Sequence, residues 1–377
     1  MSDPSGAAPL APSQSPLAGE AAEPRPPSAA EPLRFTGSEQ EFARIWFVNL
    51  ALTILTLGIY GAWGKVRTRR YLYGHTRLAG EGFEYTADPL ALLKGYLLSG
   101  AFLVAYSLAS EAAPLFGLAL FALGVALFPW MLWLSLRFNA QNTGYLGLRL
   151  RFRGALKRSY RVNLLGWLAT ALSFGTLFPL WQQRRRRYAW SGLCFGDRPV
   201  GFGAGVAPFY WASLFSTLWL FLGLLPVGFL LEAFEQAGLV RVDADGELRE
   251  GSPGDGALFL AAAAPFLLVT LALAQAAWTA RTHNAVFRGL GVGPGVSFDA
   301  RLSTWRLMWR YLQNNVLLLL TLGLAYPWTR IATWRLLTES ISVRGGERLA
   351  ETAALPADSI SALGDAASSL FEIDLGL

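Results

Sequence analysis

Cysteine and histidine are scarce in this chain of 377 residues. Cys194 has no second cysteine with which to form an intrachain disulfide bond, and a cluster of thiolate ligands is excluded for the same reason. His75 and His283 leave little for any other metal site. The enzyme signatures H-E-x-x-H, G-x-S-x-G and the Walker phosphate loop are also missing. We therefore expect a protein that is not an enzyme and that binds no metal or other cofactor.

Acidic residues are absent from the long apolar segments of the sequence. Proton pumps and ion carriers usually hold a carboxyl group within the membrane. The absence of such a group argues against proton coupling through a carboxylate. The segments are residues 45–64, 89–109, 113–136, 162–183, 207–231, 257–280 and 311–329.

Apolar residues are abundant, at 53% of the chain, and the mean hydropathy is +0.35. About 20 apolar residues are enough to cross roughly 30 Å of hydrocarbon. Many of the 14 tryptophans lie at segment ends, as in the interfacial belt of membrane proteins. We predict an all-α polytopic membrane protein with four transmembrane helices and short β hairpins on the cytoplasmic side. Three further, repeated segments either re-enter the membrane or span it, giving up to seven spans.

The chain divides into a membrane domain and two tails. Residues 1–33 are rich in proline and alanine and lack aromatic residues, so we predict a disordered tail that cannot bury enough apolar surface to fold. Residues 349–377 form an acidic C-terminal tail. The membrane domain covers residues 34–348, with internal repeats predicted over 34–148, 149–297 and, truncated, 298–348.

One motif recurs three times in the membrane domain. Its first copy, residues 49–71, begins at an asparagine, breaks at Thr56-Leu57-Gly58, and then reaches a tryptophan and a group of basic residues. The second copy starts at residue 163 and ends in four arginines, with one extra residue between its glycine and its tryptophan. The third copy starts at residue 314 and breaks at Thr321-Leu322-Gly323.

The positions of lysine and arginine distinguish two topologies. If all seven segments span the membrane, the two sides carry 18 and 13 basic residues, and this small difference gives little preference for either orientation. If the three repeated segments enter and leave on one side, the two sides carry 29 and 2. Because cytoplasmic loops retain Lys and Arg, this count favours re-entrant segments. The lengths of the repeated segments, 20, 22 and 19 residues, favour spanning, so both topologies stay open here.

Basic and aromatic residues at the ends of the repeats are candidate functional residues. Juxtamembrane Lys and Arg gain roughly 1 kcal/mol each near an anionic leaflet, and such topology anchors need no other role. Guanidinium groups also bind phosphate through paired hydrogen bonds. We therefore expect anionic lipid headgroups as partners, and no nucleic acid. The candidates are Trp63, Trp181, Trp328, Arg69, Arg70, Arg184, Arg185, Arg186 and Arg187.

Asparagines occupy the same place in each repeat. Asn49, Asn163 and Asn314 all lie within apolar segments. The simpler interpretation is a hydrogen bond between helices, worth roughly 0.6 to 2 kcal/mol. The alternative is a shared polar pore or substrate contact, which requires the three side chains to converge in space.

The first repeat and the residues after it contain the Thr-Leu-Gly-Ile-Tyr run at 56–60, Trp63, the Arg-Arg-Tyr run ending at Tyr71, His-Thr-Arg-Leu at 75–78, Phe83 and Tyr85. In these residues the chain resembles the YjgN family of bacterial inner-membrane proteins, a family of unknown function. The resemblance extends over roughly residues 34–348. It implies a multi-pass protein of the bacterial inner membrane and supplies no activity or catalytic residue.

Two functions fit these observations. Internal repeats with broken helices are typical of secondary carriers, so one hypothesis is a transporter or channel for a small solute. The alternative is a non-catalytic membrane scaffold whose basic cytoplasmic face binds anionic lipids or a partner protein. The scaffold accounts more directly for the arginine clusters and the missing acids.

Overall fold

The computed structural model describes residues 30–196, 198–242, 248–250, 254–293, 295–346 and 349. The predictions for the two tails fall almost wholly outside these residues. The exceptions lie at the two boundaries: Glu31–Pro32 forms strand β1, and Leu33 and Leu349 are buried.

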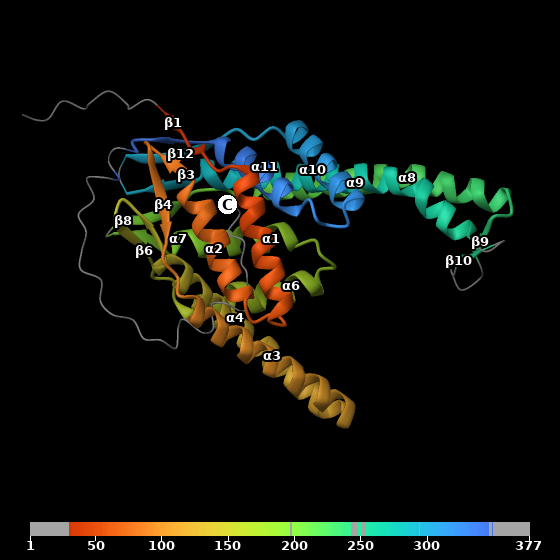
Figure 1. The fold of residues 1–377 in the computed structure, drawn as a ribbon, viewed down its shortest axis with the longest axis horizontal. Helices are drawn as coiled ribbons and strands as arrows, with labels where there is room; N and C mark the ends of the chain where they lie inside the picture. Colours follow the sequence, from red (N-terminus) through yellow and green to blue (C-terminus); the bar gives the residue numbers. More distant parts are fainter. Residues whose placement is uncertain are drawn as a thin grey trace, which may run out of the picture.

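An antiparallel sheet of 11 strands forms one end of the described structure (Figure 1). Most of these strands are neighbours in the sheet in the order in which they follow in the chain. Each strand is only two to five residues long. The strands are β1 (Glu31–Pro32), β2 (Arg34–Phe35), β3 (Thr76–Leu78), β4 (Glu81–Tyr85), β5 (Thr143–Tyr145), β6 (Leu148–Phe152), β7 (Leu193–Phe195), β8 (Arg198–Phe202), β11 (Leu290–Val292), β12 (Val296–Ala300) and β13 (Ile341–Arg344).

The segment from residue 31 to residue 35 closes this sheet into a barrel. Its first half, β1, pairs with β13, and its second half, β2, pairs with β3. Between the two halves, the Leu33 N–H donates to the Ile341 carbonyl at 3.0 Å. One continuous stretch of chain therefore joins the two ends of the meander, and the barrel has no long open edge.

Side chains alternate between the interior and the exterior of the barrel. In β6, for example, Leu148 and Phe152 are buried and Arg149 is exposed. This pattern follows from the period of two in an extended strand. An apolar interior with a polar exterior is the reverse of a barrel that spans a membrane, whose outer face is apolar. The barrel therefore lies outside the hydrocarbon.

Five pairs of helices connect the strands, and all five leave from the same rim of the barrel. Because neighbouring strands are antiparallel, two-residue turns such as Ala79-Gly80 lie at one rim and the helical connections lie at the other. The pairs are α1 (Glu39–Leu55) with α2 (Gly61–Gly74), α3 (Pro89–Ala112) with α4 (Pro114–Gln141), the run α5 (Leu156–Ser159), π-helix η1 (Tyr160–Leu165) and α6 (Gly166–Leu172) with α7 (Phe178–Ser191), α8 (Ala207–Gln236) with α9 (Asp255–Arg288), and α10 (Thr304–Leu320) with α11 (Tyr326–Glu339).

The prediction of an all-α protein is therefore wrong. The predicted hairpins exist, but their strands join across the helical insertions into one barrel. A further small sheet, β9 (Val240–Val242) with β10 (Leu248–Glu250), connects α8 to α9 at their far end.

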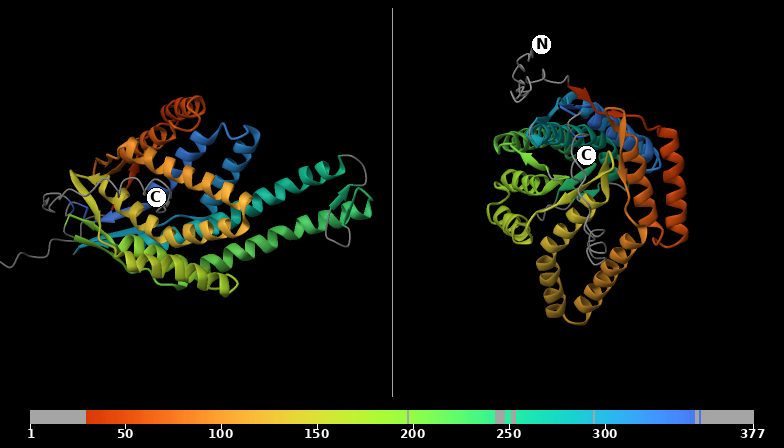
Figure 2. Two further views of the ribbon diagram at one scale, coloured as in Figure 1. Left: turned by 90° about the horizontal axis from the view of Figure 1, so that it is seen from below. Right: turned by 90° about the vertical axis from the view of Figure 1, so that its left-hand side faces the viewer.

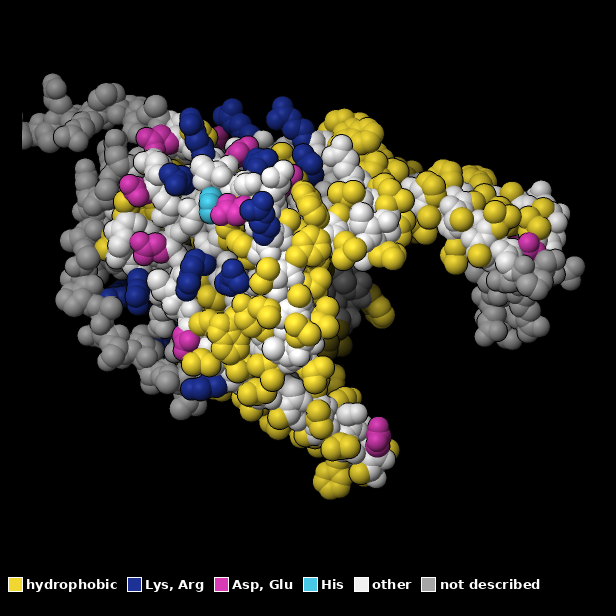
Figure 3. Space-filling model, viewed as in Figure 1, with side chains coloured by type: hydrophobic (Ala, Val, Ile, Leu, Met, Phe, Trp, Pro, Cys, Tyr) yellow, Lys and Arg dark blue, Asp and Glu magenta, His cyan; other side chains and the backbone are white. Residues whose placement is uncertain are grey.

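Four described helices are long and apolar enough to cross a membrane: α3, α4, α8 and α9. Figures 1 and 2 show the two long pairs projecting away from the barrel in different directions. In Figure 3, Lys and Arg side chains gather towards the barrel, and apolar side chains cover the projecting helices. This separation matches the division expected between the headgroup region and the hydrocarbon.

The three repeated segments form the three shorter helical pairs. Each pair leaves the barrel and returns to the same rim, so no repeated segment connects opposite ends of the molecule. The returning helices α2, α7 and α11 have 14 residues each, which corresponds to about 21 Å at 1.5 Å per residue. That length is less than the roughly 30 Å of a hydrocarbon core. Of the two topologies left open, the structure favours the one with four spans.

Cysteine labelling tests this arrangement. In a Cys194→Ser background, Ala112→Cys lies at the far end of α3, and Arg149→Cys lies on the outer face of β6; both positions are exposed. Because 27 of the 30 basic residues that the structure describes lie on the barrel side, we expect an impermeant maleimide to label position 112 in intact spheroplasts. Position 149 should react only in inside-out vesicles. The reverse pattern, or equal labelling of both positions in spheroplasts, would contradict the orientation.

Candidate functional site

The interior of the barrel opens into a cavity of about 680 Å³ that continues between the helices. This space, the barrel cavity, falls within the usual range of roughly 300 to 1,000 Å³ for ligand pockets. At its barrel end it is lined by inward-facing apolar and aromatic side chains. They include Leu78, Tyr145, Phe195, Val292, Phe298 and Ile341.

Basic side chains line the helical end of the barrel cavity. Lys65 and Arg69 come from α2, and Arg330 comes from α11. None of the described residues that line the cavity is acidic. The barrel cavity is therefore electropositive at one end and apolar at the other.

Neighbouring groups fix the three cations in place. Arg69 Nη1 donates to Asn139 Oδ1 on α4 at 2.8 Å and to Tyr85 Oη on β4 at 3.0 Å. The Lys65 ammonium lies 5.9 Å from the centroid of the Tyr96 ring, and the Arg330 guanidinium lies 5.5 Å from that of Trp334. Cation–π contacts of this kind help to hold a charge in position.

Tyr145 is the principal polar group at the barrel end. Its hydroxyl donates to the Leu78 carbonyl at 2.8 Å. Burial raises the pKa of Tyr145, and the charges of Glu31 and Glu81 raise it further. The phenol is therefore neutral at physiological pH, and the barrel end carries no charge from this residue.

The three predicted asparagines do not line the barrel cavity. Asn49 Nδ2 donates across its helical pair to the Gly64 carbonyl at 3.3 Å, and Asn314 Nδ2 donates across its pair to Thr333 Oγ1 at 2.8 Å. Asn163 Nδ2 bonds within its own turn, to the Ser159 carbonyl at 3.0 Å. The contacts of Asn49 and Asn314 match the simpler interpretation, in which the amide ties two helices together, whereas the contact of Asn163 does not.

The three predicted tryptophans lie along the helical pairs and outside the cavity lining. Trp63 stacks on Tyr60 with ring centroids 6.1 Å apart, and Trp328 contacts Phe47 edge-on at 6.0 Å. The indole N–H of Trp181 is buried without a hydrogen-bond partner among the described residues.

Of the predicted arginines, Arg69 alone is among the residues that line the cavity. Arg70 Nε donates to the Tyr85 carbonyl at 3.4 Å. In the four-arginine run, Arg184 and Arg187 are exposed, whereas Arg185 and Arg186 are partly buried. The Arg185 guanidinium lies 5.9 Å from the Trp181 ring centroid.

Sequence reasoning missed Lys65, Arg330 and Asn139 as cavity residues. A signal for the first two exists, because each lies two residues after one of the three predicted tryptophans. The residue two positions after Trp181 is Gln183, whose Nε2 donates to the Ala204 carbonyl at 2.9 Å. No local pattern points to Asn139, which reaches the cavity from α4.

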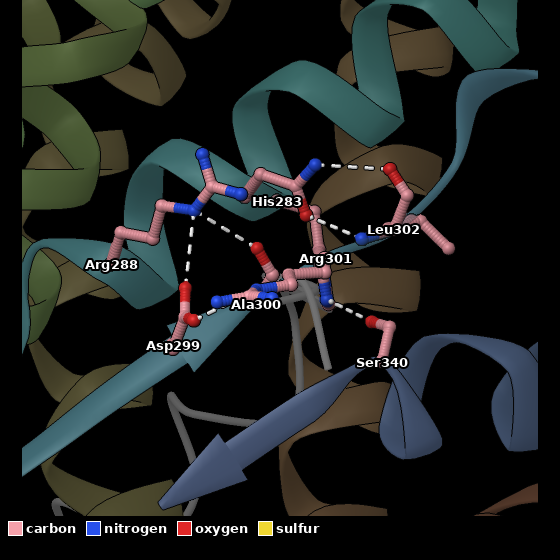
Figure 4. Close-up of polar contacts among 8 residues, drawn as sticks. His283, Arg288, Asp299, Ala300, Arg301, Leu302 and Ser340 are labelled. Atoms are coloured by element: carbon pink, nitrogen blue, oxygen red, sulfur yellow. Dashed lines mark hydrogen bonds and ion pairs between the residues drawn. The ribbon is translucent and has the colours of Figure 1, made fainter.

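A second polar cluster joins α9 to β12 and β13 at the barrel rim (Figure 4). The Asn284 side chain accepts from the Leu302 N–H at 2.8 Å and donates to the Leu302 carbonyl at 3.0 Å. His283 Nε2 lies 3.0 Å from Ser340 Oγ. These bonds pair polar side chains of α9 with groups next to β12 and β13, so the role of the cluster is to hold α9 against the barrel.

The fold and the cavity together define a multi-pass membrane protein that carries a barrel with an apolar interior at one end of its spans. The chain belongs to the family described as bacterial protein of unknown function (DUF898), whose model matches residues 30–370. It is similar to inner membrane protein YjgN of Salmonella typhimurium strain LT2, with 25% identity over 355 residues, 83% of this chain and 88% of that relative. It is also similar to inner membrane protein YjgN of Escherichia coli K12, with 31% identity over 145 residues, 38% of this chain and 36% of that relative.

These comparisons confirm the resemblance to the YjgN family and the location in the bacterial inner membrane. No solved structure matches the chain significantly. The protein is thus an inner membrane protein of a family whose function is unknown.

The ion pairs of Asp299 at the barrel rim predict that the stability of the protein depends on pH. Its carboxylate accepts from Arg288 Nε at 3.2 Å and from Arg301 Nε at 3.1 Å. Burial alone would raise the pKa of Asp299, but the hydrogen bonds and charges of Arg301 and Arg288 outweigh burial and lower it. The stability from these ion pairs is therefore present above the unfolded pKa of about 4 and is lost as the pH falls through the folded value.

We expect Asp299→Asn to lower the thermal unfolding temperature in detergent at pH 7. The variant should also lose less stability than the wild type between about pH 5 and pH 3, because the titrating group is gone. Circular dichroism at each pH measures both effects. Glu84→Gln, a change of another acidic side chain on the barrel, is the control. Parallel acid profiles for Asp299→Asn and the wild type would rule out this role.

Proposed function

We propose that this protein binds an anionic amphiphile, a molecule with an acidic headgroup and an apolar chain, in the barrel cavity. The observation that carries the proposal is the division of one continuous cavity into a basic helical end and an apolar barrel end. A small hydrophilic anion would leave the apolar end unfilled, and a neutral apolar ligand would make no use of the basic end. An anionic amphiphile satisfies both ends.

The position of the cavity suits a ligand that arrives from the membrane. At the helical end, its lining includes Trp46 of α1, Tyr96 of α3 and Tyr326 of α11, and Tyr326 is 43% exposed. Aromatic side chains with a polar edge favour the headgroup region of a bilayer. The headgroup would contact Lys65 and Arg330 there, and the apolar chain would extend into the barrel.

The barrel cavity also bears on the two hypotheses drawn from the sequence. A carrier requires an internal binding site, whereas a scaffold that binds lipids through its basic surface requires none. The cavity therefore supports transport or transfer of the amphiphile more than it supports a scaffold. Anionic lipids remain the partner class that this proposal favours.

The similarity of the short helical pairs to one another also supports the barrel cavity as the binding site. We infer that the pairs are internal repeats, because α2 and α11 place Lys65 and Arg330 at the corresponding position after a tryptophan. The second repeat has Gln183 there, and its amide is engaged by the Ala204 carbonyl. The repeats would thus have diverged: two contribute a cation to the cavity, and the third uses the same position for a hydrogen bond that stabilises the fold.

Binding of a fluorescent fatty acid to the purified full-length protein in detergent tests the proposal. Arg330→Gln removes one cation, and we expect about tenfold weaker binding, or about 1.4 kcal/mol, close to the lower end of the range for a lost charge-assisted contact. Ala140→Phe, a change within the lining, should block binding by filling the cavity. Arg344→Gln removes an exposed charge from β13 and is the matched control.

The methyl ester of the same fatty acid separates charge recognition from simple apolar partition. The ester should bind the wild type about as weakly as the acid binds Arg330→Gln. Equal binding of acid and ester, together with unchanged binding by Ala140→Phe, would exclude the barrel cavity as the site.

A further inference from the structure

The tips of the three short helical pairs share an unusual backbone geometry. In each tip, a large apolar residue with positive φ precedes a glycine with positive φ. The φ values are 51° and 95° at Leu57 and Gly58, 49° and 83° at Phe174 and Gly175, and 50° and 88° at Leu322 and Gly323. Residues other than glycine rarely adopt this conformation, and bulky apolar residues are not among those enriched in it. The same succession occurs in the β turns at Ala79-Gly80 and Leu146-Gly147, so it marks a tight turn, and the surroundings of the three tips decide their role.

The apolar residue at each tip is almost fully exposed. Leu57, Phe174 and Leu322 are 94%, 98% and 91% exposed, respectively. No charged residue lies between Arg44 and Lys65 in the first pair, and the other two pairs have similar uncharged stretches. In water, three such tips would present apolar surface with nothing to cover it.

The backbone at each tip satisfies its own hydrogen bonds. The N–H of Gly58 donates to the Thr53 carbonyl at 2.7 Å, and the N–H of Gly323 donates to the Leu318 carbonyl at 2.7 Å. The Thr56 hydroxyl accepts from the Tyr60 N–H at 2.9 Å, and the hydroxyl also donates to the Leu52 carbonyl at 2.7 Å.

Corresponding hydroxyls do the same in the other two pairs. Ser173 Oγ accepts from the Leu177 N–H at 3.2 Å, and Thr321 Oγ1 accepts from the Ala325 N–H at 3.1 Å. A turn whose N–H groups are paired within itself is suited to hydrocarbon, where no water replaces a missing partner. Such closure is unnecessary for an exposed turn in water.

We propose that these three tips insert into the acyl-chain region of the leaflet next to the barrel, as half-membrane loops. The tips leave from the same rim as the four spans, so they face the same bilayer. The returning helices, about 21 Å long, place the tips within the hydrocarbon without crossing it. The partner is therefore the lipid acyl chain, and the tips surround the helical end of the barrel with embedded contacts.

Depth-dependent fluorescence quenching tests this proposal. In the Cys194→Ser background, Leu57→Cys, Phe174→Cys and Leu322→Cys are each labelled with an environment-sensitive fluorophore. The full-length protein is reconstituted into vesicles of phospholipids brominated along the acyl chain. We expect the tip labels to lose most of their emission in brominated vesicles and to resist aqueous iodide on either side.

Leu146→Cys is the matched control. Leu146 also has positive φ, at 53°, and precedes a glycine with positive φ, but it lies in a β turn at the opposite rim. Its label should be insensitive to brominated lipid and quenched by iodide on the barrel side. A label at Leu55, Leu172 or Leu320, exposed helical residues close to the tips, replaces any tip variant that fails to fold.

Three results would overturn the proposal. Tip emission that is the same in brominated and ordinary lipid would place the tips in water or against protein. Quenching by iodide from the side opposite the barrel would mean that the short pairs span the membrane. Protection that disappears when the protein is diluted in lipid would show that a second copy covers the tips.

Discussion

Backbone pairing at residues 31–35 is the constraint on which the arrangement of this protein depends. These residues pair with β13 on one side and β3 on the other, and this closes an antiparallel meander into a barrel. In a closed antiparallel meander, every second connection lies at the same rim. All five helical pairs are therefore directed to one side, where spans, short pairs and the helical end of the cavity lie together. A parallel pairing at any point would send a helical pair to the other rim, away from the membrane.

The sequence predicted the spans well and the barrel poorly, for different physical reasons. Four of the apolar segments, 89–109, 113–136, 207–231 and 257–280, correspond to α3, α4, α8 and α9, because a continuous apolar run of that length has few other uses. The strands are two to five residues long, and many of their partners lie on the far side of a helical pair. Alternation around Gly80 revealed one hairpin, but it held no information about how many hairpins pair side by side.

The site shows the same contrast between local and tertiary information. Arg69 was predicted from its place after a tryptophan, and the structure places it in the cavity lining. The other predicted residues contribute to the helical pairs themselves, as Asn49 does through its bond to Gly64 and Asn314 through its bond to Thr333. Lys65 and Arg330 lie 265 positions apart in the sequence, and only the closure of the barrel brings α2 and α11 to one cavity.

Closure by the first strands also imposes an order on biosynthesis. Arg34–Phe35 can pair with β3 soon after both leave the ribosome, whereas Glu31–Pro32 must wait for β13, which is translated after all five helical pairs. Until then the two ends of the sheet cannot be joined, because β1 has no partner strand. The helical pairs can therefore insert one after another while the ring is unfinished, and the last strand completes the ring only once the membrane part is in place.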